Sequence, residues 1–370
     1  MSRKFVEGLL ERADIRTDGA RPWDMRVHDE RVFDRMLADG NLGLGEAYMD
    51  GWWDCDDLEE FFVRLIRSDV RSNVGRSWKI VWYYLRSRFL NLQNRRRSWR
   101  VNWEHYDIDN DLYAQMLDRR MVYTCAYWKD ADSLDGAQEA KLDLICRKLG
   151  LRKGQRLLDI GCGFGGLAAF AAQRYGATVT GITLSKEQRA AALEKCRGLP
   201  VEIRLQDYRD LGAEQFDHIA SVEMIEAVGH RNFRMYMETA HRCLKSGGLF
   251  VLQAIGQNAS SRSGDPWLDR YIFPNGMLPS VAQLGKAIDG LFVLEDWHNF
   301  GQYYVKTLRS WHKNFLSAWP VLAQRYSERF KRMWEYYLLS CAGAMRSRHI
   351  QLWQIVLSKG GVMGGYVAPR

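Results

Sequence analysis

A glycine-rich loop preceded by a carboxylate lies at residues 158–166, where a predicted strand passes into a predicted helix. Glycines at such a junction allow the backbone to approach a ligand closely and then turn into the helix. In dinucleotide-binding enzymes a comparable loop holds a pyrophosphate. The carboxylate of Asp159 would repel phosphates but suits an ammonium group. The loop therefore favours a nucleotide that bears an amino acid, S-adenosylmethionine (AdoMet), over an ordinary tight turn.

Two further polar segments follow the next predicted strands. After the third strand, Asp207 can accept a hydrogen bond from an adenine amino group, and Tyr208 can lie along the ring. The second strand lacks the acid expected to hold ribose hydroxyls, so the hydroxyls, backbone groups and Gln188 of residues 183–188 would have to replace it. Ligands of doubly wound sheets bind at these carboxyl ends of strands. The segment around Asp207 could otherwise be a solvated turn.

Two carboxylates, Glu223 and Glu226, follow the fourth predicted strand at a spacing of i and i+3. They lie where a reacting group would bind, and we expect one of them to face the site and the other to face solvent. The alternative is that each is simply an acid favoured by the dipole at the start of a helix.

A dense polar and aromatic region precedes the first strand, at residues 104–113 and 123–128. Its position suits a lid that folds over the cofactor. On composition alone, aromatic core packing is the other interpretation.

Strand and helix patterns alternate through the second half of the chain and would position these segments. Apolar runs predict strands at residues 156–161, 179–184, 201–205, 216–222, 249–254 and 351–357. Helical patterns lie at residues 165–176, 185–196, 231–244 and 306–345, and the third of them would end in a glycine cap at Gly247-Gly248. This alternation predicts an α/β fold with a doubly wound parallel sheet.

The first hundred residues have a different pattern. Residues 1–63 predict short helices joined at glycines, with a turn-rich aromatic stretch at 43–53. Residues 58–92 read as a helix whose apolar face includes Trp78, Trp82 and Phe89. We therefore expect a helical N-terminal domain at 1–100 and a catalytic domain at 101–370.

The net charge of +8 is unevenly distributed. Residues 1–63 carry a net charge of −8, residues 64–100 carry +10, and the remainder carries +6. A segment as basic as 64–100 usually faces nucleic acid, a membrane or an acidic protein, and otherwise forms a solvated helix face.

Composition excludes several classes of protein. A chain of 370 residues that is 46% hydrophobic is long enough for a sizeable core, and it is neither disordered nor collagenous. Seven cysteines without a CxxC pair exclude a dense disulfide scaffold and favour a reducing compartment. No apolar run approaches the roughly 18 residues needed to span a bilayer, and the start of the sequence lacks a signal-peptide core, so we expect a cytoplasmic protein. No pair of histidines has metal-ligand spacing, and we expect no metal.

Together these segments resemble the cyclopropane-fatty-acyl-phospholipid synthase family, AdoMet-dependent enzymes related to the mycolic acid cyclopropane synthases. The resemblance runs from about Gly43 to the C-terminus. It rests on the motifs at residues 43–53, 105–107, 123–128, 158–166, 183–188, 206–210, 271–276, 295–301 and 341–344. It implies a seven-stranded, Rossmann-like AdoMet-dependent methyltransferase sheet with a smaller N-terminal helical domain that associates with lipid.

The resemblance implies transfer of a methylene group from AdoMet to the cis double bond of an acyl chain in a membrane phospholipid. The product is a cyclopropane ring, formed through a carbocation that a bound bicarbonate deprotonates. Carried over to this chain, the bicarbonate site comprises Cys125, Glu226, Gln253, Ile255 and Tyr304. The family's usual histidines are replaced by Ala227 and Gln253, so methyl-branched or methylene products are the alternative. We expect cyclopropanation to be retained because Glu226 and Tyr304 remain.

Cofactor contacts are also implied by the resemblance, and the electrostatic argument above adds Asp159 to them. They are Tyr123, Thr124, Asp159, Gly161, Cys162, Gly163, Thr183, Leu184, Gln188, Asp207 and Tyr208. With an acyl-modifying site attached, the basic segment favours an anionic phospholipid surface over nucleic acid. We expect peripheral association with the inner face of the membrane and a homodimer, as is common in the family. Cys341 is expected to be structural, because the chemistry needs no enzyme nucleophile.

Overall fold

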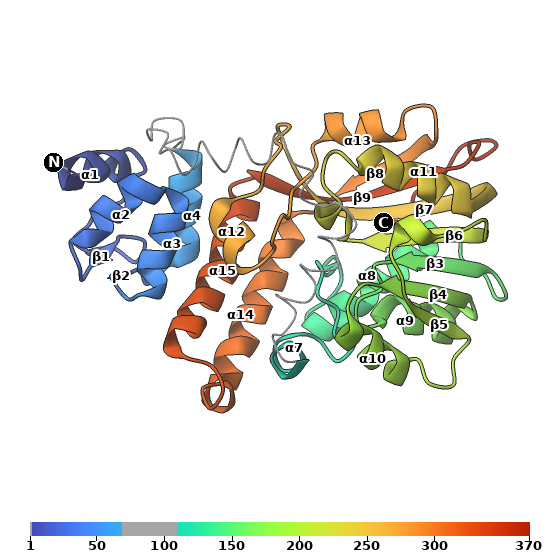
Figure 1. Cartoon of the computed structure of the whole chain (residues 1–370), viewed down its shortest axis with the longest axis horizontal. Coiled ribbons are helices and arrows are strands. Elements are labelled where there is room, and N and C mark those ends of the chain that lie inside the picture. Colours follow the sequence, from blue (N-terminus) through green and yellow to red (C-terminus); the bar gives the residue numbers. More distant parts are fainter. Residues whose placement is uncertain (1, 69–109) are drawn as a thin grey trace. The chain divides into compact units, whose positions relative to one another are not determined.

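The computed structural model describes residues 2–68 and 110–370, which fall into two compact units (Figure 1). The helical unit contains residues 2–68, 262–276 and 304–350, and the sheet unit contains residues 110–261, 277–303 and 351–370. The N-terminal helices therefore share a unit with two segments from the second half of the chain. Most of the basic segment 64–100 and the motif at 105–107 lie outside the described residues.

The sheet unit is built on seven strands in the order β5-β4-β3-β6-β7-β9-β8. The first five strands in this order are parallel, and β8 at the far edge is antiparallel to β9. The predicted α/β fold with a doubly wound sheet is therefore confirmed. The strands are β3 Arg156–Ile160, β4 Thr178–Thr183, β5 Val201–Leu205, β6 Phe216–Val222, β7 Leu244–Gln257, β8 Val293–Asn299 and β9 Ile350–Ser358.

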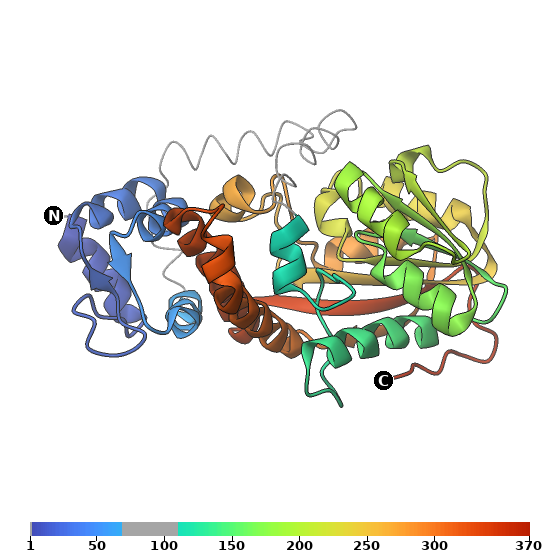
Figure 2. The same cartoon turned by 90° about the horizontal axis from the view of Figure 1, so that it is seen from below.

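Two groups of helices cover the two faces of this sheet (Figures 1 and 2). The first group packs on side chains such as Leu157 and Val179, and comprises α8 Leu134–Lys148, α9 Gly166–Tyr175 and α10 Lys186–Lys195. The second packs on side chains such as Ile219 and Phe250, and comprises α11 Phe233–Cys243 and α13 Val281–Ile288. Because the strands are apolar on both faces, each face needs such a cover.

The parallel pairing brings the ends of four strands to one edge of the sheet. β3 pairs with β4 and β6 on its two sides, so the strand order reverses beside β3. Ligands of open α/β sheets bind outside the carboxyl ends of strands at such a switch point. The glycine loop, residues 183–188, Asp207 and the Glu223–Glu226 turn all follow strands that end there.

Three details differ from the sequence-based expectation. A glycine cap was expected after the helix at 231–244, but α11 ends at Cys243 and the paired strand β7 already begins at Leu244. The helical pattern at 306–345 is two helices, α14 Gln302–Leu322 and α15 Glu328–Arg346. Helix α8 and the edge strand β8 were not predicted.

The helical unit also corrects the turn expected at residues 43–53. Its N-terminal elements are α1 Ser2–Arg12, β1 Arg26–Val27, α2 Arg31–Asp39, α3 Asn41–Met49, β2 Trp53–Asp54 and α4 Leu58–Arg67. Gly43 and Gly45 lie inside α3 rather than in a turn. A Cβ on Gly43 would lie 2.2 Å from the carbonyl oxygen of Arg35, and one on Gly45 would lie 2.4 Å from the indole of Trp267. These glycines permit close helix packing.

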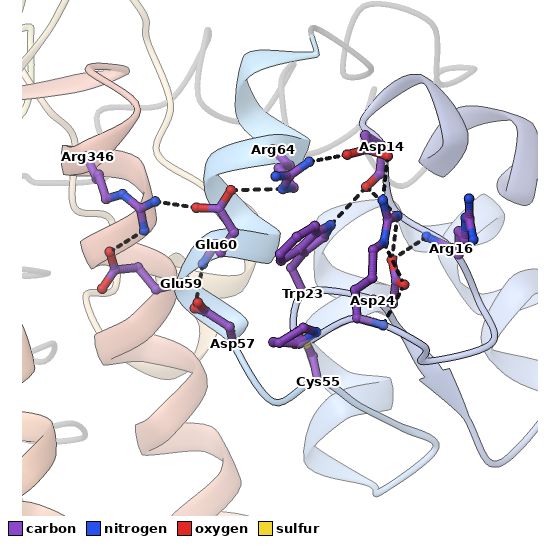
Figure 3. A network of polar contacts seen from close by, with 12 residues as sticks. Asp14, Arg16, Trp23, Asp24, Cys55, Asp57, Glu59, Glu60, Arg64 and Arg346 are labelled. Atoms are coloured by element: carbon purple, nitrogen blue, oxygen red, sulfur yellow. Dashed lines mark hydrogen bonds and ion pairs between the residues drawn. The ribbon is translucent and has the colours of Figure 1, made fainter.

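Ion pairs join the helices of this unit to one another. Arg346 of α15 contacts Glu59 and Glu60 of α4, and Arg64 contacts both Glu60 and Asp14 (Figure 3). Helix α12, Pro266–Tyr271, contacts α3 in the same unit.

Within residues 2–68 and 110–370, no helix combines the length and apolarity needed to cross a bilayer.

Candidate active site

The glycine loop after β3 turns sharply through left-handed backbone. Gly161 has φ of 83° and Gly163 has φ of 52°. The backbone N–H groups of Gly161 and Cys162 both donate to the carbonyl of Ile182 in β4, at 3.0 and 2.9 Å. A Cβ on Gly161 would lie 2.6 Å from Met224 Cγ, whereas one on Gly163 would meet nothing within 4 Å. Only glycine fits at Gly161 without moving its neighbours.

The carboxyl group of Asp159 lies at the start of this loop and is almost fully buried. Its Oδ2 atom has no hydrogen-bond partner. Burial raises the pKa of Asp159 to about 7, and the charge of Lys141 opposes that rise. A buried carboxyl with an unsatisfied oxygen is costly, and the ammonium group of an amino acid would satisfy it. Asp159 therefore fits the amino-acid end of AdoMet.

Asp207 and Tyr208 present unsatisfied polar atoms after β5. Asp207 Oδ1 accepts from the backbone N–H of Arg209 at 2.9 Å, and its Oδ2 has no partner although the residue is buried. The Tyr208 hydroxyl is also unpartnered, and its ring packs edge-on against Tyr236 at 5.1 Å. An adenine amino group could donate to Asp207 Oδ2, as the sequence analysis expects.

A hydroxyl and amide cluster follows β4 at the place where an acid was missing. The Thr183 hydroxyl lies 2.9 Å from Gln188 Oε1 and accepts from the Ser185 N–H at 3.2 Å. Ser185 also caps α10, because its Oγ accepts from the Gln188 N–H at 3.1 Å. Residues Thr183, Leu184 and Gln188 are therefore held in a fixed turn at the ligand-binding edge.

Both carboxylates after β6 are held by groups of the sheet unit, where the sequence predicted that one would face solvent. Glu223 Oε1 accepts from the Cys125 N–H at 2.9 Å and from Gln253 Nε2 at 2.6 Å. Glu226 Oε1 accepts from the Ile255 N–H at 2.6 Å, and its buried Oε2 has no partner. Burial, and secondly the charge of Glu223, raise the pKa of Glu226 to about 8.

Gln253 is held from both sides within β7. Its side chain is fully buried, and its Oε1 accepts from Gln354 Nε2 of β9 at 2.8 Å. With Oε1 facing Gln354, the Nε2 end of the amide donates to Glu223. The backbone N–H of Glu223 also donates to the Gln253 carbonyl at 2.8 Å. The two residues are thus joined by backbone and by side chain.

Lys141 is a site residue that the sequence analysis missed. Its side chain is fully buried in α8, and Nζ lies 2.5 Å from the Thr124 hydroxyl. Burial lowers the pKa of Lys141 to about 8, while the charges of Glu223 and Asp159 act against that lowering. A signal exists in the sequence, because Ala137, Lys141 and Ile145 recur at the spacing of one helix face that is otherwise apolar.

Two further residues expected in the site, Tyr123 and Tyr304, have aromatic contacts in the structure. The ring of Tyr123 packs against Tyr113 at 5.1 Å. Tyr304 belongs to the helical unit, where it is buried in α14 with its ring 6.0 Å from that of Trp311.

Burial raises the pKa of the Cys341 thiol to about 12, which suits a structural role. The described parts of the chain contain no group of three His, Cys, Asp or Glu residues placed to hold a metal ion.

The groups expected to hold bicarbonate are already engaged by the chain. The N–H groups of Cys125 and Ile255 and the amide of Gln253 all donate to carboxylate oxygens of Glu223 and Glu226. A free anion would have to displace Glu223 and lie beside two carboxyl groups. As arranged, these residues do not fit bicarbonate.

This sheet, with a glycine loop and unsatisfied acidic groups at the carboxyl ends of its strands, defines an AdoMet-dependent methyltransferase. Residues 93–355 match the family model described as mycolic acid cyclopropane synthetase. The chain belongs to this family of cyclopropane synthases, and the resemblance drawn from the sequence is confirmed.

Relatives support that assignment over nearly the whole chain. The cyclopropane-fatty-acyl-phospholipid synthase of Escherichia coli (strain K12) is 51% identical over 365 residues, which are 99% of this chain and 95% of the relative. A probable fatty acid methyltransferase of Pseudomonas putida is 40% identical over 269 residues, covering 69% of this chain and 68% of the relative.

Solved structures show the same fold. The cyclopropane synthase MmaA2 from Mycobacterium tuberculosis matches with a TM-score of 0.67 and 27% identity, covering 73% of this chain and all of the other. The mycolic acid cyclopropane synthase CmaA1, complexed with SAH and CTAB, matches with a TM-score of 0.65 and 28% identity, covering 70% of this chain and 98% of the other.

Proposed function

We propose that the chain transfers a methylene group from AdoMet to the cis double bond of an acyl chain in a membrane phospholipid and so forms a cyclopropane ring. The observation that carries this proposal is the carboxyl pair Glu223 and Glu226 beside the AdoMet loop, with an unsatisfied Glu226 Oε2 in a buried place. A site that must stabilise a passing positive charge and then remove a proton needs such groups. The near-full-length similarity to the Escherichia coli synthase supports the same reaction.

The reaction balances without an enzyme nucleophile. AdoMet supplies an electrophilic methyl group on a sulfonium sulfur. The alkene electron pair forms a bond to that carbon, the C–S bond breaks with its electrons on sulfur, and a cation is left on the other alkene carbon. Loss of a proton from the added methyl group then closes the ring, because the C–H electron pair forms the second C–C bond. The products are S-adenosylhomocysteine, the cyclopropane and one proton.

The chain's residues would orient the two substrates and stabilise the cation. Asp159 would hold the ammonium group, Asp207 the adenine, and the Thr183 turn the ribose. The carboxyl pair would lie near the positive charge that develops on the alkene. The resemblance implies bicarbonate as the base, with Tyr304 among its ligands. The donors expected for that ion are engaged by Glu223 and Glu226 instead.

The second candidate function is a methyl transfer that gives methyl-branched or methylene products instead of a cyclopropane ring. Gln253 stands where the family's usual histidine would be, and an amide cannot titrate. A slower removal of the proton would leave the cation time to give methyl-branched or methylene products. Fatty-acid methyl esters from a synthase-null host that expresses the chain should contain cyclopropane acids by mass spectrometry. Only methyl-branched acids in that experiment would refute the proposed reaction.

We also propose that the N-terminal region and the basic segment 64–100 bring the enzyme to the inner face of the membrane. The segment carries a net charge of +10 and aromatic residues, which suit anionic headgroups and the interface below them. Binding to anionic vesicles should exceed binding to RNA and should weaken with salt. Replacing Arg95, Arg96 and Arg97 with Gln should reduce vesicle binding at low salt. The homodimer expected from the family would appear as twice the monomer mass by light scattering.

A further inference from the structure

Glu223 holds an uncommon backbone conformation at the end of β6. Its φ is 52°, in the left-handed region that costs a non-glycine residue roughly 1 kcal/mol. The Glu223 N–H donates to the Gln253 carbonyl, so this conformation is pinned by the neighbouring strand. Backbone strain of this kind persists where the surroundings impose it, and it is common at functional sites. Here the strain directs a carboxylate toward the Cys125 N–H and the Gln253 amide.

A single oxygen atom of Glu223 receives both of these donors. The Cys125 N–H and the Gln253 Nε2 lie 2.9 and 2.6 Å from Oε1. Two donors that converge on one oxygen suit an ionised carboxylate as the acceptor. The Gln253 amide presents Nε2 to Glu223 and Oε1 to Gln354 Nε2.

The carboxyl pair itself opposes the binding of a further anion beside it. Glu226 lies three residues on, and its pKa is raised to about 8 by burial and by Glu223, so it carries a proton at neutral pH. The pair then holds one negative charge, and the buried Lys141 lies close enough to interact with it. Adding bicarbonate would place a second negative charge in the same low-dielectric region.

We propose that Glu223 is a further catalytic residue, whose own carboxylate takes the place of bicarbonate and receives the proton from the added methyl group. This inference rests on the proposed function. In the step, a C–H bond of the added methyl group breaks, its electron pair forms the ring bond, and the proton binds the Glu223 carboxylate. Glu223 returns the proton to water before the next turnover.

The test compares the wild-type chain with Glu223→Gly and Glu223→Gln, each with AdoMet and vesicles of unsaturated phospholipid. Glycine suits the left-handed backbone and removes the carboxylate, so this variant should fold and leave an anion-sized space. Glutamine keeps the side-chain size but cannot accept the proton as a carboxylate does. Calorimetric binding of AdoMet shows that each variant keeps its fold.

The wild-type rate should be the same in carbonate-depleted buffer and with added bicarbonate. Glu223→Gly should lose about 100-fold or more of its rate, and added bicarbonate should restore part of it, whereas Glu223→Gln should lose activity without recovery. A wild-type rate that falls on carbonate depletion and returns with bicarbonate would overturn the inference. Full activity of Glu223→Gly without bicarbonate would overturn it as well. The products separate the two proposals: if the wild type forms no cyclopropane lipid under any condition, the proposed function itself fails.

Discussion

The backbone N–H of Ile255 donates a 2.6 Å hydrogen bond to Glu226 Oε1, so strand β7 holds the carboxyl group of the turn that follows β6. The other oxygen, Oε2, is buried and has no partner. Burial and the neighbouring Glu223 raise the pKa of Glu226 to about 8, which leaves the group protonated at neutral pH. Glu226 therefore offers a neutral, oriented carboxyl group beside Glu223.

Replacing Glu226 with Gln should lower kcat by about 100-fold. The amide oxygen can still accept from Ile255, but the amide cannot share or pass on a proton. The KM for AdoMet should change little, because the AdoMet contacts lie in other turns. Rates at saturating lipid, together with calorimetric AdoMet binding, measure the two effects. A loss of AdoMet binding equal to the loss of rate would show that Glu226 shapes the cofactor site instead.

Replacing Asp159 with Asn should weaken AdoMet binding by about 10-fold or more, because the variant removes a buried charge partner for the ammonium group. S-adenosylhomocysteine carries the same ammonium group and should lose a similar factor. Methylthioadenosine lacks the amino acid and serves as the control, since its affinity should be unchanged. Calorimetry with the three ligands measures this. An equal loss for methylthioadenosine would mean that the loop has been disturbed and that Asp159 does not read the ammonium group.

The sequence predicted the part of the site that follows from strand order. Asp159, Thr183 and Asp207 each come directly after or within a recognisable strand, and parallel pairing must bring those positions to one edge. Lys141 and the inward direction of Glu223 were not predictable in this way. Lys141 lies on a helix whose burial depends on packing against the sheet, and the direction of Glu223 depends on a positive φ and on donors from β7 and residue 125.

Packing also explains why the turn expected at residues 43–53 is wrong. Gly43 and Gly45 were interpreted as turn residues from local propensity. In the structure they are helical because the missing side chains admit Arg35 and Trp267, which lies more than 200 residues along the chain. Tertiary contact of that kind outweighs the roughly 1 kcal/mol preference against glycine in a helix.

Gly161→Ala should reduce stability and AdoMet binding more than Gly163→Ala does. Both positions have positive φ, so both variants carry the cost of left-handed backbone. Only the Cβ at Gly161 would lie 2.6 Å from Met224 Cγ, so this variant alone must also move its neighbour. That clash should add about 1 to 3 kcal/mol. Thermal unfolding with and without AdoMet measures both variants, and equal losses would mean that the backbone cost dominates.

The buried His218 should make the sheet unit less stable as the pH falls below about 6.5. Its Nδ1 accepts from the Leu249 N–H at 3.3 Å, and burial lowers the pKa of His218 to about 4. The unfolded chain binds a proton near pH 6.5 while the folded chain does not, so this group's stabilisation is present above pH 6.5 and is lost toward pH 4. From pH 7 to pH 5 the loss should be about 2 kcal/mol.

His218→Asn keeps an acceptor for Leu249 but cannot gain the proton in this range. Its stability should therefore change less between pH 7 and pH 5 than that of the wild type, as measured by urea unfolding at each pH. A wild-type curve and a variant curve that run parallel would show that other groups cause the acid sensitivity.

Glu59 should be a sensitive ion-pair residue of the helical unit. Its side chain is only 5% exposed and receives Arg309 at 2.7 and 2.8 Å and Arg346 at 2.9 Å (Figure 3 shows the Arg346 side). Glu59→Gln would leave two guanidinium groups without the carboxylate that they share. The cost should be only about 2 to 3 kcal/mol, because both arginine side chains remain partly exposed to solvent.

Asp56→Asn is the matched control, since that carboxylate pairs with Arg26 at the surface. Hydrogen exchange of α4 and α15 should quicken in the first variant and stay unchanged in the second. Equal protection in both variants would show that apolar packing of the two helices, not this ion pair, holds them together.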